Sequence, residues 1–334
     1  MRDRSISVHF VRAVLSHAVS SGLDPASLLR KNRISPRLLL EDSARISIER
    51  FADLQVDTML AMGDEALGYA SRRMPIGSWS MMCYAVIGCQ SLGQALSRYC
   101  RFYQLFDFGV HPHLLVEGEQ ATIRLINADP DWQCEPYFSE WGLFNVHRFG
   151  SWLAQEHLPI RIARLAGPPT APAADYRHVF LAHPVRFEQD RTELILSSAL
   201  LDKRVTQSEQ SLRHFLRHPA LIMLTQRYAG NSWTAQVREI VRLRLGGDIP
   251  ELREVAQRLA VHPQTLRRRL ASEGTTFKEI KNQVRRDTAL HFLGKQGLSI
   301  EDIACRAGFS ESSAFIRAFK SWTGVTPYTY RKGL

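Results

Sequence analysis

The C-terminal part of this chain contains the stretch Glu254-Val-Ala-Gln-Arg-Leu-Ala-Val-His-Pro-Gln-Thr-Leu-Arg-Arg-Arg-Leu270. A related stretch follows it, Asp302-Ile-Ala-Cys-Arg-Ala-Gly-Phe-Ser-Glu-Ser-Ser-Ala-Phe-Ile-Arg-Ala-Phe319. Ala256 matches Ala304 at an offset of 48, and later positions match at an offset of 49, after one extra turn residue. Each stretch has the pattern of a helix, a tight turn and a second helix, which is the helix-turn-helix arrangement. Because the pattern occurs twice, the sequence predicts a domain that binds specific DNA sequences.

Positive charge is concentrated in the same part of the chain. Residues 235–334 hold 18 Lys and Arg against 10 Asp and Glu, a net of +8, whereas residues 1–234 hold 25 against 23, a net of +2. A basic domain joined to a nearly neutral one indicates a polyanionic partner at one end. A merely solvated basic surface is the alternative, but it does not explain why the charge coincides with the repeated motif.

In the first motif, we expect the second helix to carry the side chains that read bases. Leu266 and Leu270 would pack it against the first helix, and the small Ala256 would let the two helices cross closely. Arginine can bond O6 and N7 of guanine together, and glutamine can bond N6 and N7 of adenine. The outward side chains are Gln264, Arg267 and Arg268, with Arg269 to the side and directed at phosphate.

The second motif is built alike. We expect Gly308 to make the turn, Ser310 to cap the second helix, and Phe315 and Phe319 to anchor it in the core. Its outward residues include fewer strong base-reading groups, so we expect this helix to position the protein more than to discriminate between sequences. These outward residues are Ser312, Ser313, Ile316 and Arg317, with Lys320 directed at phosphate.

The segment between the motifs, residues 276–293, has apolar positions at helical spacing and predicts one long linking helix. Such a helix would hold the two motifs apart, and reading successive major grooves on one face of DNA needs a separation of roughly 34 Å. An ordinary helical bundle with surface arginines is the alternative interpretation. The repeat, the turn positions and the outward Gln and Arg cluster do not follow from that alternative.

These residues resemble the arabinose-regulator (AraC/XylS) family of bacterial transcription regulators. The resemblance covers residues 235–332 and rests on three segments, Leu266-Arg-Arg-Arg-Leu270, Gly308-Phe-Ser-Glu-Ser-Ser-Ala-Phe-Ile-Arg-Ala-Phe-Lys320 and Trp322-Thr-Gly-Val-Thr-Pro327 through Tyr330-Arg331. It implies two helix-turn-helix units on one monomer. The outward residues that match base-contacting positions of the family are Gln264, Arg267, Arg268, Ser312, Ser313, Ile316 and Arg317. The chain departs from the family at His262, where a small capping residue is usual, and at Ser312, which is often proline.

The N-terminal part resembles the subgroup with an arabinose-binding-like effector domain. Pro75-Ile-Gly-Ser78, Ser91-Leu-Gly-Gln-Ala-Leu96 and His183-Pro-Val-Arg-Phe187 carry this resemblance. We therefore expect an α+β protein, in which a mixed α/β effector and dimerisation domain precedes an all-α DNA-binding domain. The expected boundaries are 1–202 for the effector domain, 203–233 for a helical connector and 234–334 for the DNA-binding domain.

Patterning supports the mixed character of the N-terminal part. Apolar spacing predicts helices after Ser7 and over 48–61, 92–105 and 137–156. The alternating segment 114–127, broken by Glu117-Gly-Glu-Gln120, predicts a β-hairpin. Further short strands are expected at 161–165, 185–187 and 194–196.

No phosphate loop, nucleophile elbow or zinc-protease motif is present, so we expect neither an enzyme nor a cofactor. His111-Pro-His113 is expected to lie in a solvated loop rather than to bind a metal. A small-ligand site needs a mostly apolar pocket with a few convergent polar groups. Candidate effector-binding residues are Trp79, Tyr84, Arg98, Tyr103, Tyr137, Trp141 and Arg148, although residues at this spacing are more often simple core.

The remaining composition points to the cytoplasm. The five cysteines include no Cys-x-x-Cys pair and are expected to be reduced core thiols, with a redox pair of Cys83 and Cys89 as the alternative. No apolar run reaches 18 residues, so no membrane partner is expected. The N-terminus reads as an amphipathic helix with an internal arginine rather than as a signal peptide.

Three functions are compatible with these observations. The first is a regulator of promoter DNA that responds to a small metabolite. The second is a constitutive DNA binder whose N-terminal domain only dimerises or binds a protein partner. The third is an enzyme with a DNA-binding tail, for which residues 1–234 supply no catalytic set. The family resemblance favours the first, and it also implies activation, RNA polymerase as a partner and a homodimer.

Overall fold

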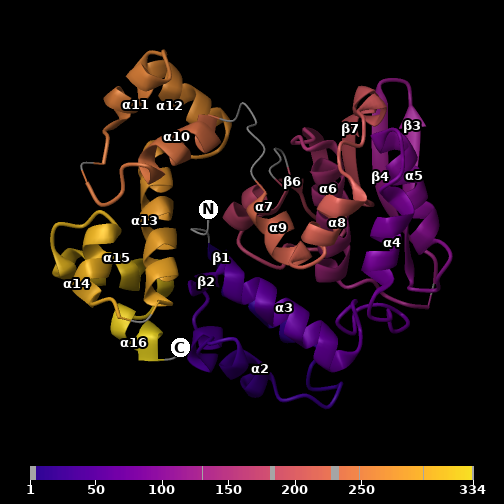
Figure 1. The fold of residues 1–334 in the computed structure, drawn as a ribbon, viewed down its shortest axis with the longest axis horizontal. Coiled ribbons are helices and arrows are strands. Elements are labelled where there is room, and N and C mark those ends of the chain that lie inside the picture. Colours follow the sequence, from indigo (N-terminus) through magenta and orange to yellow (C-terminus); the bar gives the residue numbers. More distant parts are fainter. Residues whose placement is uncertain are drawn as a thin grey trace. The chain divides into compact units, whose positions relative to one another are not determined.

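The computed structural model describes residues 5–129, 131–180, 185–226, 233–247, 249–295 and 297–332. Two compact units make up the chain, and each gathers segments that are separated in the sequence. The two units draw on the described residues as follows: the DNA-binding unit contains 5–8, 29–51 and 233–332, and the sheet unit contains 9–28 and 52–226. Helices and strands are present in both, so the predicted α+β fold class is confirmed (Figure 1).

This division differs from the boundaries expected at residues 202 and 233, because residues 5–8 and 29–51 join the C-terminal segment. Residues 203–226 of the expected connector belong to the sheet unit and contain two short helices, Glu209–Phe215 and Pro219–Thr225, and its residues 227–232 lie outside the described ranges. His183 and Pro184 of the third N-terminal segment also lie outside them.

A five-stranded sheet organises the sheet unit, with the strand order β3-β4-β7-β5-β6. Every described pairing in it is antiparallel except that of β5 with β6. Gly118, at φ 56°, and Glu119 make a two-residue turn between β3 and β4, which suits the twist of a hairpin. The strands are β3 (Val110–Glu117), β4 (Gln120–Asn127), β5 (Ile160–Arg164), β6 (Val185–Arg186) and β7 (Thr192–Ser197).

The predicted hairpin is confirmed, but its first strand begins earlier than the alternation indicated. His111, Pro112 and His113 lie in β3 and not in a loop, so the loop expectation was wrong. Proline is tolerated there because β3 is an edge strand, where a missing backbone donor breaks no ladder on the open side. The Gln104 side-chain amide donates to the Pro112 carbonyl at 2.8 Å and lies 3.3 Å from His113 Nδ1.

The long helix α6 packs against β4 and β7. It is buried along nearly its whole length because apolar side chains occur on most of its faces. The predicted helices over 48–61, 92–105 and 137–156 are confirmed within two residues at each end. The helices of this unit are α1 (Val8–Leu15), α2 (Pro25–Lys31), α3 (Ile48–Met62), α4 (Ser78–Val86), α5 (Leu92–Tyr103), α6 (Pro136–Ala154), α7 (Ala173–Phe180), the 3₁₀ helix η2 (Ser198–Asp202), α8 (Glu209–Phe215) and α9 (Pro219–Thr225). Of these, α1, α2 and α3 begin or end in the DNA-binding unit.

The C-terminal segment of the DNA-binding unit is helical. The predicted linking helix is α13, which begins after a capping box between Thr276 and Glu279 and runs to Leu293. Its N-terminal half shares a core with α10, α11 and α12, and its C-terminal half packs against α14 and α15. These helices are α10 (Trp233–Arg242), α11 (Leu252–Arg258), α12 (Pro263–Ser272), α13 (Phe277–Leu293), α14 (Ile300–Arg306), α15 (Ser312–Thr323) and α16 (Pro327–Lys332).

The N-terminal segments of the same unit add a short hairpin that the sequence did not predict. Strands β1 (Ser5–Ser7) and β2 (Arg45–Ser47) pair antiparallel over three residues. The 3₁₀ helix η1 (Pro36–Leu40) precedes β2. Three residues are too few for an alternating pattern to be recognised, which is why the periodicity of the sequence gave no sign of these strands.

Candidate nucleic-acid interface

The two helix-turn-helix motifs have equivalent backbone geometry. In the first, Ala260 has φ 53° and the amide of Val261 donates to the Ala256 carbonyl at 3.0 Å. In the second, Gly308 has φ 78° and the amide of Phe309 donates to the Ala304 carbonyl at 2.9 Å. The second motif then needs one more residue before its second helix begins. The 48 and 49 offsets of the sequence therefore mark a real structural repeat with one inserted turn residue.

Gly308 supplies a test of the close packing at the turn of the second motif. A Cβ there would lie 2.5 Å from Ile249 Cδ1, whereas a Cβ at Gly297, which also has a positive φ, would meet nothing within 4 Å. We expect Gly297→Ala to cost about 1 kcal/mol from backbone conformation alone, and Gly308→Ala about 2–3 kcal/mol. Denaturant titration of the full chain, followed through amide hydrogen exchange in α15, measures both. Equal losses would show that Ile249 moves aside freely.

The first recognition helix presents its polar side outward. Leu266 and Leu270 are buried against the core, as predicted, and Gln264, Arg267 and Arg268 are exposed. The helix starts at Pro263 because His262 caps it, with Nδ1 accepting from the Gln264 amide at 3.3 Å. His262 thus does the work of the small capping residue usual in the resembling family.

Arg269 is placed differently from its neighbours. Its guanidinium lies 4.0 Å from the centroid of the Trp233 ring and is half-buried. Four residues further on, the Glu273 carboxylate accepts from the backbone amides of Trp233 and Thr234, both at 2.8 Å. The end of α12 therefore caps and stacks on the start of α10, and Arg269 is part of that contact.

The second recognition helix is anchored by aromatic side chains. Phe315 and Phe319 are fully buried, their ring centroids are 5.7 Å apart, and Phe319 packs edge-on against Tyr330. Of the five outward residues, Ser313, Arg317 and Lys320 are exposed, whereas Ser312 and Ile316 are half-buried. Glu311, whose side chain makes no capping hydrogen bond, occupies the N-cap position in place of Ser310, so that expectation was wrong. The extra turn residue moves the cap by one position.

Two further arginines of this unit interact with the protein itself, and the sequence gave no sign of their roles. Arg285 donates to the Gly308 carbonyl at 2.8 Å and lies over the Phe309 ring, so it braces the turn of the second motif. Arg306 lies over the Phe292 ring. A positive charge in this domain is therefore not by itself a sign of DNA contact.

Six of the seven candidate effector residues make contacts within the sheet unit. Trp79 packs edge-on against Phe149, whereas the ring of Tyr103 is tilted against Tyr99 and that of Tyr137 against Tyr69, as core aromatics do. The structure places the other four as follows: Trp141 stacks on Phe138, the exposed Arg98 donates to the Ala85 carbonyl, the buried Arg148 donates to the Val179 carbonyl, and Tyr84 is exposed.

A surface hollow of about 450 Å³ lies elsewhere in the sheet unit. Arg124, Asn127, Ser139 and Arg191 are among its polar lining residues, and none of the seven candidates lines it. Arg124 and Arg164 hold the buried carboxylate of Glu193 at 2.8 and 2.6 Å. Burial acts to raise the pKa of Glu193, but the two arginines hold it below its ordinary value. In the sequence, the alternation of apolar and polar residues along 120–127 was the one signal that could have pointed to Arg124 as a residue lining this hollow.

Glu140 is a buried carboxyl of this unit that is bonded to hydroxyl groups. It accepts from Thr170 Oγ1 at 2.6 Å and from the Tyr176 hydroxyl at 2.7 Å. Burial raises its pKa from 4.5 to about 7, against the opposing effect of these two hydrogen bonds. The folded chain therefore keeps a proton on Glu140 that the unfolded chain loses at lower pH.

This shift predicts a pH dependence of stability. As the pH rises from about 4.5 to about 7, the sheet unit should lose about 3 kcal/mol, because the folded state disfavours ionisation. Glu140→Gln removes that loss, so the variant should melt above the unmodified chain at pH 8 but not at pH 5. Thermal unfolding at both values measures it, with the exposed Glu119→Gln as control. A gain of equal size at both pH values would contradict the assignment.

Within the residues that the structure describes, no three His, Cys, Asp and Glu side chains lie close enough to hold a metal ion. None of the helices among those residues has both the length and the apolar character needed to cross a membrane.

Comparison with known proteins agrees with this geometry. Residues 22–205 match the model of the arabinose-binding domain of AraC transcription regulator, N-term, and residues 255–333 match a helix-turn-helix domain. The chain is 26% identical over 328 residues to the ornithine utilization regulator of Pseudomonas aeruginosa, covering 98% of this chain and 96% of that protein. It is 24% identical over 331 residues to an uncharacterized HTH-type transcriptional regulator of Mycobacterium tuberculosis, covering 97% and 96%. Among solved structures, the transcriptional regulator CdpR of P. aeruginosa matches 92% of this chain and 96% of its own, at 22% identity and a TM-score of 0.33.

Proposed function

The chain belongs to the AraC family of DNA-binding transcription regulators with an arabinose-binding-type N-terminal domain, and from this we propose that it activates promoters in response to a small metabolite. The observation that carries the proposal is the pair of equivalent motifs, each with a polar face exposed on its second helix. We place the protein in the cytoplasm, as a homodimer that acts with RNA polymerase.

We propose that Gln264, Arg267 and Arg268 read base edges from the N-terminal part of α12. Their exposure and their position match the geometry in which a recognition helix enters the major groove. On α15 we propose that Arg317 reads bases with Ser312, Ser313 and Ile316, and that Lys320 contacts phosphate. For Arg269 we retain phosphate contact as the proposal, with the guanidinium leaving its place over Trp233 to make it.

We propose that the metabolite binds the sheet unit. The hollow has an apolar wall and charged groups of both signs, since Arg191 and Asp190 line it together with Arg124, which is paired with Glu193, and this lining suits an amino acid with its two opposite charges. The ornithine utilization regulator is named for an amino acid pathway, and this places amino acids first in a search. The seven candidates from the sequence remain proposals, although most of them are committed to packing in this structure.

The experiment has two arms. Selection of random duplex DNA on the purified full chain, at a stated salt concentration, tests sequence-specific binding, and enrichment of a site with two boxes is expected. A thermal-shift screen against amino acids, organic acids, sugars and fatty acids tests the metabolite, because a ligand at 100 times its Kd stabilises by roughly 2.7 kcal/mol. DNA selection without any thermal shift favours the second candidate function, a constitutive binder that dimerises through its N-terminal domain.

The exposed residues of the sheet unit are the reason to keep that second candidate. Leu105 and Val116 are 73% and 53% exposed, and Val116 lies on the edge strand β3. An open edge strand with exposed apolar side chains can pair with another chain. Sedimentation of the purified protein with and without DNA distinguishes a constitutive dimer from one that forms only on the site.

A further inference from the structure

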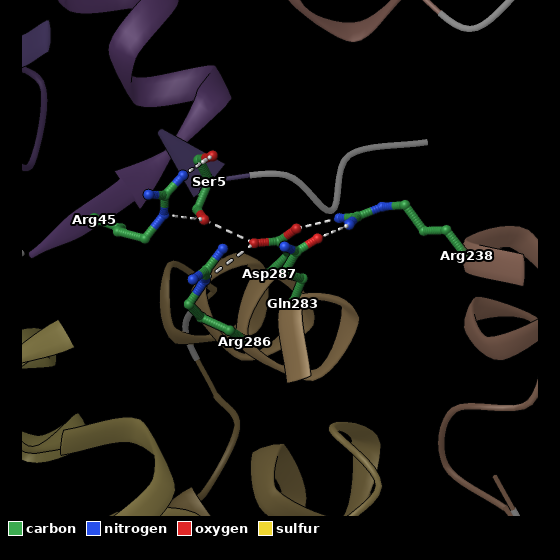
Figure 2. Close-up of polar contacts among 6 residues, drawn as sticks. All are labelled: Ser5, Arg45, Arg238, Gln283, Arg286 and Asp287. Carbon is green, nitrogen blue, oxygen red and sulfur yellow. Dashed lines mark hydrogen bonds and ion pairs between the residues drawn. The ribbon is translucent and has the colours of Figure 1, made fainter. Parts of the chain in front are cut away.

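The linking helix α13 carries a buried carboxylate, Asp287, on which three parts of the DNA-binding unit meet (Figure 2). Its side chain is 4% exposed. Its Oδ2 is ion-paired with Arg238 of α10, and its Oδ1 lies 3.5 Å from Arg286 Nε. The same Oδ1 accepts a hydrogen bond from Ser5 Oγ, at 2.7 Å, in strand β1. A residue of the extreme N-terminal part of the chain thus bonds directly to the helix that joins the two motifs.

The Ser5 hydroxyl is itself oriented by a second arginine. Arg45 of β2 donates from Nε to Ser5 Oγ and from Nη2 to the Ser5 carbonyl, both at 3.0 Å. A hydroxyl that accepts from Arg45 has its one hydrogen available for Asp287. On the hydrophobic side, the paired Ile6 and Ile46 are buried, so the hairpin is held by packing as well as by charge.

Arg238 carries the network to the first motif. It also donates from Nη1 to Gln283 Oε1 at 3.2 Å, so α10 is joined to α13 at two adjacent turns. Val237 and Val241 of the same helix share the hydrophobic core with Leu266 and Leu270 of α12. Any displacement of α10 along α13 therefore moves the first recognition helix, whereas α15 packs on the far half of α13.

The buried charges around Asp287 couple the hairpin, α10 and α13 to one another. Burial acts to raise the pKa of Asp287, but Arg238 and Arg286, with Ser5 and Arg45, hold it below its ordinary value, so the carboxylate stays ionised. Removing one member of a buried ion network leaves the others desolvated without a partner, which costs far more than losing a surface pair. The hairpin, α10 and α13 are thus expected to dock and undock together.

We propose that Asp287 is the positioning residue that sets the first recognition helix on the linking helix, and that the N-terminal hairpin completes this setting through Ser5. The spacing between α12 and α15, and with it the spacing of DNA boxes that the chain accepts, depends on residues 5–7 and 45–47. The inference rests on the proposed DNA contacts of α12 and α15. Strands β1 and β2 continue without interruption into α1 and α3, which enter the sheet unit, so the hairpin lies beside two of the places where the chain passes from one unit to the other.

The test compares Ser5→Val with Ser5→Thr in the full chain. The two side chains have the same shape and β-branching, and only threonine keeps the hydroxyl. On the two-box site, we expect Ser5→Val to bind about tenfold more weakly than Ser5→Thr, as for the loss of a hydrogen bond to a charged group. On a single first box, the two variants should bind equally. With one, two or five base pairs inserted between the boxes, Ser5→Val should lose less affinity than Ser5→Thr, because its motifs are less rigidly spaced.

A readout without DNA keeps the positioning claim separate from the DNA-binding claim. Amide hydrogen exchange in α10 should be faster in Ser5→Val, and faster still in Asp287→Asn, while exchange in α15 stays unchanged. If the unmodified chain selects no DNA but α10 responds in this way, the proposed function fails and the positioning role stands. If exchange in α10 and the dependence on box spacing are both unchanged in Ser5→Val, the positioning role is wrong. Equal weakening on one box and on two boxes also overturns it, because that would report general destabilisation.

Discussion

A chain that carries Arg267→Ala and Arg268→Ala together should bind its selected DNA site about a hundredfold more weakly, or worse. Both side chains are exposed near the start of α12, and a good bidentate contact to a base is worth roughly 1–3 kcal/mol. The loss should be larger on the selected sequence than on unrelated DNA, because base contacts carry specificity and phosphate contacts do not. Titration of labelled duplexes at constant salt measures both affinities.

The control removes the same charge from the other unit. Arg161 and Arg213 are exposed, on β5 and α8, and replacing both with alanine changes the net charge by the same amount. That variant should bind the selected site as the unmodified chain does, apart from a small uniform electrostatic effect. Wild-type binding by the Arg267 and Arg268 variant would show that α12 does not enter the groove.

Phe319→Ala should cost about 3–5 kcal/mol of folding free energy and abolish binding to the two-box site at 37 °C. The ring is fully buried between Phe315 and Tyr330, and truncating it leaves a cavity that the surrounding aromatic side chains cannot fill. Denaturant unfolding followed through exchange of α15 amides measures the loss.

Tyr328→Ala is the matched control for this second change. Tyr328 lies two residues from Tyr330 on the same helix, α16, but its side chain is 52% exposed. Removing an exposed aromatic ring should change stability by less than about 0.5 kcal/mol. A similar loss in both variants would mean that α16, and not the aromatic core, determines the stability of the second motif.

The DNA-binding domain was predictable because its physical signals are local. Ala256 and Ala304, the leucines and phenylalanines four residues apart, and the capping box at Thr276 each specify a feature within one or two helical turns. Where that prediction failed, one residue was responsible. Ser310 looks like a cap, but the extra residue in the second turn places Glu311 there instead.

The effector domain was predictable only in outline. The helices and the main hairpin follow from periodicity, whereas contacts between distant aromatic residues do not. Trp79 and Phe149, or Tyr69 and Tyr137, meet through tertiary packing, so their spacing in the sequence could not show whether they form a core or a pocket. His111-Pro112-His113 was assigned to a loop because proline and polar residues favour loops, but the open edge of the sheet tolerates them.

The hairpin on α13 was beyond prediction for a different reason. Ser5 and Asp287 are separated by 282 positions, and no local pattern relates them. Asp287 itself reads as one polar residue on the exposed side of an amphipathic helix, yet it is among the most buried charged groups described. A carboxylate flanked by arginine in a helix gives no indication that its partner is a serine near the start of the chain.

The discontinuity of the DNA-binding unit also bears on how the chain acquires its structure during synthesis. A ribosome adds roughly 5–20 residues per second and releases residues 5–8 and 29–51 well before residues 233–332 exist. Until α13 has been made, strands β1 and β2 have no linking helix to dock on, and by then the sheet unit is already complete in sequence. Contacts of such long sequence separation form slowly. We therefore expect the newly made regulator to become competent for DNA later than its sheet unit folds, only after the hairpin of β1 and β2 has docked on α13.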